Sequence, residues 1–126
     1  MTQENELTAK QQLDLVLKHI ETTKMENVLS LDVEEYTPFA CYYVIATCTN
    51  MRNLGAMADD IEEFFESVGL EVVGKDGVPE SGWIIIQGGD VAVHLFLDVN
   101  RKEINLEGFI KQLTRKSDKI YQKSAK

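Results

Sequence analysis

The chain has 126 residues, 44% of them hydrophobic, and its 21 acidic residues outnumber 13 basic ones to give a formal net charge of -8. This length predicts one domain, residues 1–126, that buries roughly two-thirds of the surface exposed by the unfolded chain. The acidic balance disfavours free nucleic acid as a partner of the whole domain. No segment approaches the ~18 apolar residues of a membrane span, so no membrane partner is expected.

Hydrophobic periodicity predicts helices and strands in the order α-β-β-α-β-β-β-α. Thr8 to Gln11 has the form of a capping box that begins the first helix, and Gly69 occupies the C′ position that ends the second. Asn100 to Glu103 has the form of a further cap. The expected elements are a helix over about 8–23, strands over 27–35 and 41–49, a helix over 51–68, a strand over 70–74, a hairpin over 81–98 and a helix over 104–120. This order predicts an α/β fold, with a mixed sheet of about five strands and flanking helices.

Cys41 and Cys48 lie seven residues apart in the second predicted strand. An odd offset in a strand sends side chains to opposite faces, so neither a disulfide nor a shared metal ion is expected. Two reduced cysteines are typical of a cytosolic protein, which predicts a cytoplasmic location.

The most informative stretch is SGWIIIQGGDVAVHLFLD, residues 81–98, which predicts a β-hairpin with two unlike faces. Gly88-Gly89 has the composition of a two-residue turn, since glycine tolerates φ > 0. That turn pairs Gln87 with Asp90, Ile85 with Ala92 and Trp83 with His94. The aliphatic face, expected to pack on the core, consists of Ile84, Ile86, Val91, Val93, Leu95 and Leu97. The other face collects the only tryptophan, a histidine and Asp90, which suits recognition by a partner.

The spacing of Asp90, His94 and Asp98 does not favour a metal site. About 13 Å separates positions four apart on a strand, which is too far to share one ion. His94 is better interpreted as an aromatic neighbour or a hydrogen-bond donor than as a ligand. No Gly-x-Ser-x-Gly elbow occurs, and the Gly88-Gly89 pair precedes a strand rather than the helix of a phosphate loop. We therefore expect no catalytic residue, no metal and no cofactor.

A set of short motifs carries a family resemblance: Leu31-Asp32-Val33, Thr49 to Arg52, WIIIQGGDVAVHLF at 83–96, Arg101 and Leu106-Glu107. Together they resemble the ribosomal silencing factor family, also called Iojap, from about Leu7 to Ile110. The resemblance implies a nucleotidyltransferase-like fold without the catalytic carboxylates. It also implies binding to the large ribosomal subunit through its protein L-fourteen, which hinders joining of the small subunit and lowers translation when nutrients are short.

Carried over to this chain, the resemblance implies a partner-binding surface around the hairpin. The residues included are Thr49, Arg52, Trp83, Gln87, Gly88, Asp90, Val91 and His94. Trp83 would be the anchor, because tryptophans at interface centres often carry much of the binding free energy. The chain departs from the family pattern with Met51 in place of serine, Gln87 in place of aspartate, and Ile104 and Ile110 in place of tyrosine and tryptophan.

The C-terminal part of the chain differs in charge from the rest. Residues 101–126 hold eight basic and three acidic residues. The basic segment from about Lys111 to Lys126 predicts a helix or tail that lies near ribosomal RNA, and its alternative is a solvated helix followed by a frayed tail.

Two functions of other classes stay open at this point. One is a nucleotide-handling enzyme that kept the transferase-like fold, and the other is a dimeric interaction module unrelated to ribosomes. A homodimer of the free protein is compatible with either a silencing factor or such a module.

Overall fold

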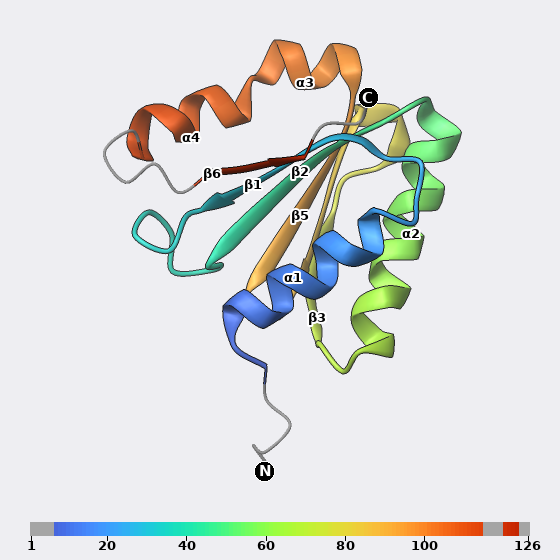
Figure 1. Cartoon of the computed structure of the whole chain (residues 1–126). Helices are drawn as coiled ribbons and strands as arrows, with labels where there is room; N and C mark the ends of the chain where they lie inside the picture. The colour runs from blue at the N-terminus through green and yellow to red at the C-terminus, as the bar shows by residue number, and fades with distance from the viewer. Residues whose placement is uncertain (1–6, 115–119, 124–126) are drawn as a thin grey trace.

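The computed structural model describes residues 7–114 and 120–123 and places four helices around one mixed β-sheet (Figure 1). The helices are α1 (Ala9–Ile20), α2 (Met51–Ser67), α3 (Asp98–Ile104) and α4 (Leu106–Thr114), and a short 3-10 turn, η2, spans Pro79–Ser81. The strands are β1 (Glu26–Asp32), β2 (Tyr42–Cys48), β3 (Val72–Asp76), β4 (Trp83–Gly88), β5 (Val91–Leu97) and β6 (Ile120–Lys123). No helix in this described part of the chain is long and apolar enough to cross a membrane.

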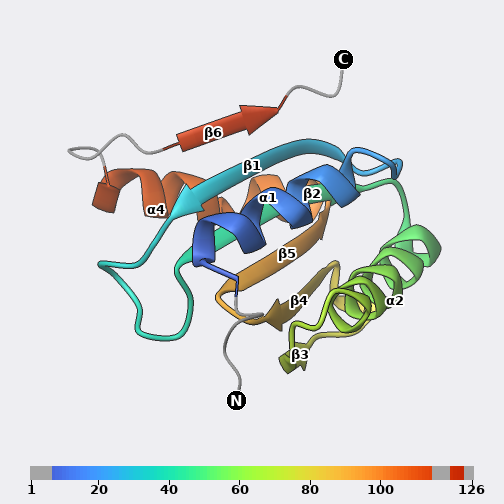
Figure 2. The ribbon, with the colours of Figure 1, turned by 60° about the horizontal axis from the view of Figure 1, so that its bottom comes forward.

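The strands follow the spatial order β3-β4-β5-β2-β1-β6. The central pair, β2 and β5, is parallel, and the other neighbouring pairs are antiparallel. The predicted mixed sheet with flanking helices is confirmed. The sequence does not predict β6: Ile120, expected in the last helix, instead begins a strand that lies beside β1 at the sheet edge (Figure 2). This pairing satisfies backbone groups that an edge strand leaves open.

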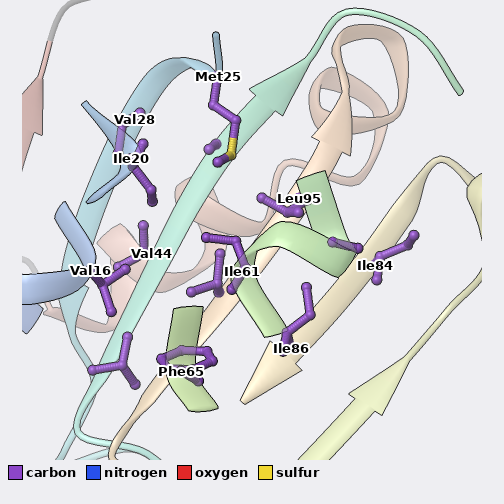
Figure 3. Close-up of a cluster of buried hydrophobic side chains, with 14 of the residues drawn as sticks. Val16, Ile20, Met25, Val28, Val44, Ile61, Phe65, Ile84, Ile86 and Leu95 are labelled. Atoms are coloured by element: carbon purple, nitrogen blue, oxygen red, sulfur yellow. The ribbon is translucent and has the colours of Figure 1, made fainter. Parts of the chain in front are cut away.

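Two hydrophobic clusters fill the two faces of the sheet. Helices α1 and α2 cover one face, where Val16 and Phe65 pack with Ile86 and other aliphatic side chains (Figure 3). On the other face, Ile110 of α4 belongs to a smaller cluster with Phe96 of β5. Strand β2 contributes to both clusters, so it is buried on both faces of the sheet.

Two of the three predicted helix caps are present. Thr8 Oγ1 accepts a hydrogen bond from the Gln11 amide at 3.1 Å, and Gln11 Oε1 accepts one from the Thr8 amide at 2.9 Å. Gly69 follows α2 with a φ of 80°, as the C′ position requires. Strand β3 begins two residues later than predicted because the Leu70 amide still donates to the Phe65 carbonyl, at 2.8 Å.

The two cysteines are free thiols, as expected. Cys48 lies in the larger core cluster, where burial raises the pKa of its thiol to about 12. Cys41 precedes β2 and is half-buried, and burial raises the pKa of its thiol as well. Neither cysteine therefore has the ionised thiol that a nucleophile needs.

The hairpin forms, but its predicted register is wrong by two residues. Trp83 lies opposite Phe96 rather than His94. The two-residue turn is Gly89-Asp90 rather than Gly88-Gly89. A shift of two residues leaves every side chain on its predicted face, so the aliphatic face and the face that carries Trp83 are both as expected.

The position of the turn is fixed by contacts from the helices. Gly88 belongs to β4, where a Cβ atom would overlap the ring of Phe65. Gly89 has a φ of 57°, and a positive φ at the first turn residue alone is the pattern of a type II′ turn. The Asp90 amide donates to Oε1 of Gln12 at 2.7 Å, and Gln12 Nε2 donates to the Asp90 carboxylate at 3.1 Å. Helix α1 therefore holds the turn at Asp90.

The predicted last helix is divided into α3 and α4. Asn105 separates them in the left-handed conformation, with a φ of 52°, and its amide donates to the Arg101 carbonyl at 2.8 Å. Asparagine adopts this conformation more readily than most residues. Helix α3 begins at Asp98, directly after β5, so the predicted cap at 100–103 lies inside a helix.

Arg101 of α3 links helices α3 and α4 to the sheet. Its Nη1 donates to the Asn27 carbonyl at 2.6 Å and to Thr47 Oγ1 at 2.8 Å. Its Nε lies 3.0 Å from a carboxylate oxygen of Glu107. One buried guanidinium therefore joins β1, β2 and α4.

Candidate functional site

Trp83 begins β4 on the face opposite α1 and α2. Its ring stacks on Phe96, with 5.0 Å between the centroids and 21° between the planes. Its Nε1 donates a hydrogen bond to Nδ1 of His94 at 3.2 Å. Because Phe96 is fully buried and Trp83 is half-buried, one side of the indole rests on the core and part of it faces solvent.

His94 lies beneath this surface rather than on it. Its side chain is 4% exposed and also contacts Tyr43, whose ring centroid lies 4.4 Å away. Burial lowers the pKa of the imidazole to about 4, so His94 is neutral at physiological pH. The interpretation of His94 as an aromatic neighbour of Trp83 is confirmed, although its ring nitrogen accepts the hydrogen bond instead of donating it.

We expect stability to fall as the pH drops from 7 to 5, by about 2 kcal/mol from His94 alone. The unfolded imidazole takes up a proton near pH 6.5, whereas the folded one stays neutral until about pH 4. Acid therefore favours the unfolded chain across this window. Urea denaturation at each pH measures how the free energy of unfolding changes with pH. H94L is the control, because it should lose the part of this pH dependence that His94 causes. An equal pH dependence in the parent and H94L would contradict the prediction.

The other end of the hairpin is held in place by its neighbours. The Gln87 side-chain amide donates to the Phe39 carbonyl. Gly88 and Val91 are buried, and Val91 is part of the aliphatic core. Of the predicted turn residues, Gln87 and Asp90 are therefore the ones whose side chains reach the surface, and both are half-buried.

Thr49 and Arg52 lie at the junction of β2 and α2 and are exposed. The Thr49 amide donates to Oδ1 of Asn53 at 3.1 Å, which orders the junction. The last residue of β2, Cys48, pairs with Leu97 of β5, and Trp83 pairs with the neighbouring Phe96. The junction of β2 and α2 therefore lies at the same end of the sheet as Trp83. The Gly89-Asp90 turn lies at the opposite end. The predicted partner-binding residues thus form two groups, and about 13 Å of β4 separates Trp83 from Gln87.

The face between these groups is ordered in rows across β4, β5 and β2. The rows are Trp83 with Phe96 and Thr47, Ile85 with His94 and Ile45, and Gln87 with Ala92 and Tyr43. Trp83, Ile85 and Gln87 are half-buried, whereas the β5 members of the rows are buried. We call the surface formed by Trp83, Ile85, Gln87 and Tyr43, with the carbonyl of Phe39 at its edge, the Trp83 face.

Phe39 and Tyr43 are members of this face that the sequence analysis missed. Phe39 is 76% exposed, and its backbone carbonyl accepts a hydrogen bond from the side-chain amide of Gln87. Tyr43 also lines a cavity of about 130 Å³ with Tyr36 and Phe109. The sequence does contain a signal that Phe39 lies at the surface, because it directly follows Pro38. An aromatic side chain in a proline-containing loop has no regular core position to fill.

The acidic residues and histidine that recur every four positions do not converge. Asp90 is bound by Gln12, His94 is buried, and Asp98 pairs with Lys102 at 3.1 Å. Within residues 7–114 and 120–123, no group of three or more His, Cys, Asp or Glu side chains could hold a metal ion. The side chains that this site brings together are aromatic and polar.

Comparisons with known proteins agree on one family. The model of the family described as "Ribosomal silencing factor during starvation" matches residues 6–126. Curated ribosomal silencing factors are similar to this chain: one from Bacillus subtilis is 31% identical over 84 residues, covering 67% of this chain and 71% of that protein. Another, from Chromobacterium violaceum, is 26% identical over 93 residues, covering 74% of this chain and 76% of that protein.

Solved structures share the fold. A crystal structure of a protein from Chromobacterium violaceum has a TM-score of 0.76 and 23% identity, covering 82% of this chain and 86% of that one. A crystal structure from Bacillus halodurans has a TM-score of 0.69 and 24% identity, covering 79% of this chain and 93% of that one. Because the family model spans nearly the whole sequence, the chain belongs to the ribosomal silencing factor family.

Proposed function

We propose that this protein represses translation without catalysis, by docking on the large ribosomal subunit through the Trp83 face and blocking the small subunit. The observation that carries the proposal is the setting of Trp83, stacked on buried Phe96 and hydrogen-bonded to buried His94. A fixed aromatic side chain loses little conformational entropy on binding, which favours a tight contact. The ribosomal partner is protein L-fourteen, as in the family pattern, and a ribosomal partner places the protein in the cytoplasm.

The surroundings of Trp83 supply the other parts of an interface. Ile85 adds apolar area, while Gln87, bound to the Phe39 carbonyl, adds a polar group at the far end of the face. Arg52 and Thr49 lie at the Trp83 end and supply polar contacts at the rim. A docked domain hinders a neighbouring subunit by its bulk, so the function needs no reacting group. A nucleotide-handling activity is the competing proposal, and turnover of nucleoside triphosphates by the purified protein would favour it.

Replacing Trp83 by Glu should weaken binding to purified large ribosomal subunits at least thirtyfold, about 2 kcal/mol. The substitution puts a charge into a desolvated contact and removes the aromatic anchor. Co-sedimentation with large subunits measures the affinity. Ala56→Glu is the matched control, because it adds the same charge on an exposed position of α2, on the other face of the sheet. A W83E variant that is folded by circular dichroism and pellets like the parent would show that this face is not the interface.

Two further proposals concern this function: that the basic C-terminal segment contacts ribosomal RNA, and that the free protein forms a homodimer. Lys111 is exposed on α4, but Arg115, Lys116, Lys119 and Lys126 lie outside the described residues. Their contact with ribosomal RNA stays a prediction, and β6 places part of the expected tail in the sheet. A homodimer of the free protein that used the Trp83 face would compete with the ribosome.

A further inference from the structure

His94 has a buried polar atom that core packing does not explain. Its Nε2 has no hydrogen-bond partner among the described residues, and the side chain is 4% exposed. A buried polar group without a partner lowers stability, and an apolar side chain of similar size would avoid that loss. The histidine therefore provides something other than packing.

The hydrogen bond to Trp83 identifies what it provides. An indole Nε1 can only donate, so Nδ1 of His94 must present its lone pair and the imidazole proton must lie on Nε2. Leu, Ile or Val at this position would offer no acceptor. The one nitrogen of His94 that is used is the one that faces Trp83.

The neighbours of His94 hold its ring in that orientation. Tyr43 packs against the imidazole with 4.4 Å between ring centroids, while Trp83 lies at 6.0 Å. Ile85 and Ile45 are its partners across the adjacent strands. The acceptor is therefore fixed by the sheet, whereas Trp83, at the first position of β4, is half-buried.

We propose that His94 is a positioning residue of the docking site: its Nδ1 holds the indole of Trp83 in the rotamer that the ribosomal partner recognises. The proposal rests on the proposed function and deepens it. Without the acceptor, Trp83 samples other rotamers in the free protein, and binding has to select one of them. Immobilising one such side chain on binding lowers affinity by about threefold to tenfold.

Two substitutions separate positioning from packing. His94→Asn keeps an acceptor, because Asn Oδ1 can occupy the place of Nδ1, but leaves an amide in the core. His94→Leu removes the acceptor and the partnerless nitrogen together. H94L should be at least as stable as the parent yet bind large subunits about threefold to tenfold more weakly, while H94N should be less stable yet bind like the parent. A packing role predicts the reverse, with affinity following stability.

The free protein gives a readout that does not depend on ribosomes. Trp83 is the only tryptophan, so the chain has one indole N–H resonance in its NMR spectrum. That proton should exchange slowly with solvent in the parent and in H94N, and at least threefold faster in H94L. An H94L spectrum with an unchanged indole resonance and exchange rate would overturn the proposal.

A double-mutant cycle tests whether His94 acts through Trp83. Trp83→Phe removes the indole donor, so H94L should cause no further loss of large-subunit binding in the W83F background. An equal loss in both backgrounds would also overturn the proposal. If W83E binds like the parent, the docking function itself is wrong, and this outcome is distinguishable because the indole exchange rates are measured without ribosomes.

Discussion

Replacing Arg101 by Ala should lower the free energy of unfolding by about 3–5 kcal/mol. The side chain of Arg101 is 10% exposed and that of its partner Glu107 is 21% exposed. Truncation leaves this carboxylate without its cation, and the Asn27 carbonyl and the Thr47 hydroxyl without their donor. Urea denaturation measures the loss. The dependence of the unfolding free energy on urea concentration should not change, because the same surface is exposed on unfolding.

Matched variants distinguish a broken ion pair from lost packing around Arg101. The double variant R101M/E107L removes both charges and keeps apolar volume, so it should recover much of the stability lost in R101A. Arg101→Lys keeps the charge but not the fork that reaches three partners, and its loss should be intermediate. A loss below about 1 kcal/mol in R101A would show that the network adds little to stability.

The elements that the sequence predicts well are those fixed by local chemistry. The capping box at Thr8, the helical spacing of α2 and its end at Gly69 all depend on residues close together in the chain. The two faces of the hairpin depend only on period-two alternation, and they are also correct. For the same reason alternation could not give the register, because a shift of two residues preserves both faces.

The features that the sequence misses are those decided by distant contacts. Phe65 excludes a side chain at position 88, and Gln12 binds Asp90, so two helices far away in sequence decide where the hairpin turns. The left-handed Asn105 divides the last helix, and β1 recruits residues 120–123 as a strand. The burial of His94 is also decided by a distant contact. The sequence predicts His94 on a recognition face, but Tyr43 of another strand packs against its imidazole, so His94 lies as a buried hydrogen-bond acceptor beneath a half-buried Trp83.

Replacing Gly88 by Ala should lower the free energy of unfolding by about 3 kcal/mol. The added Cβ would overlap the ring of Phe65, which is fully buried in the larger core cluster. The φ of Gly88 is not in the left-handed region, so the loss reports this overlap and not backbone strain. Urea denaturation measures the loss.

Gly74 provides the matched control, since it also lies in a strand of the same sheet but a Cβ there would meet no atom within 4 Å. G74A should leave stability unchanged or raise it by up to about 1 kcal/mol, through the lower entropy of the unfolded chain. Phe65→Leu frees space above position 88, so in that background G88A should cost clearly less than it does in the parent. Equal losses in both backgrounds would mean that the ring of Phe65 is not what requires glycine at this position, and that the turn is held at Gly89-Asp90 by Gln12 alone.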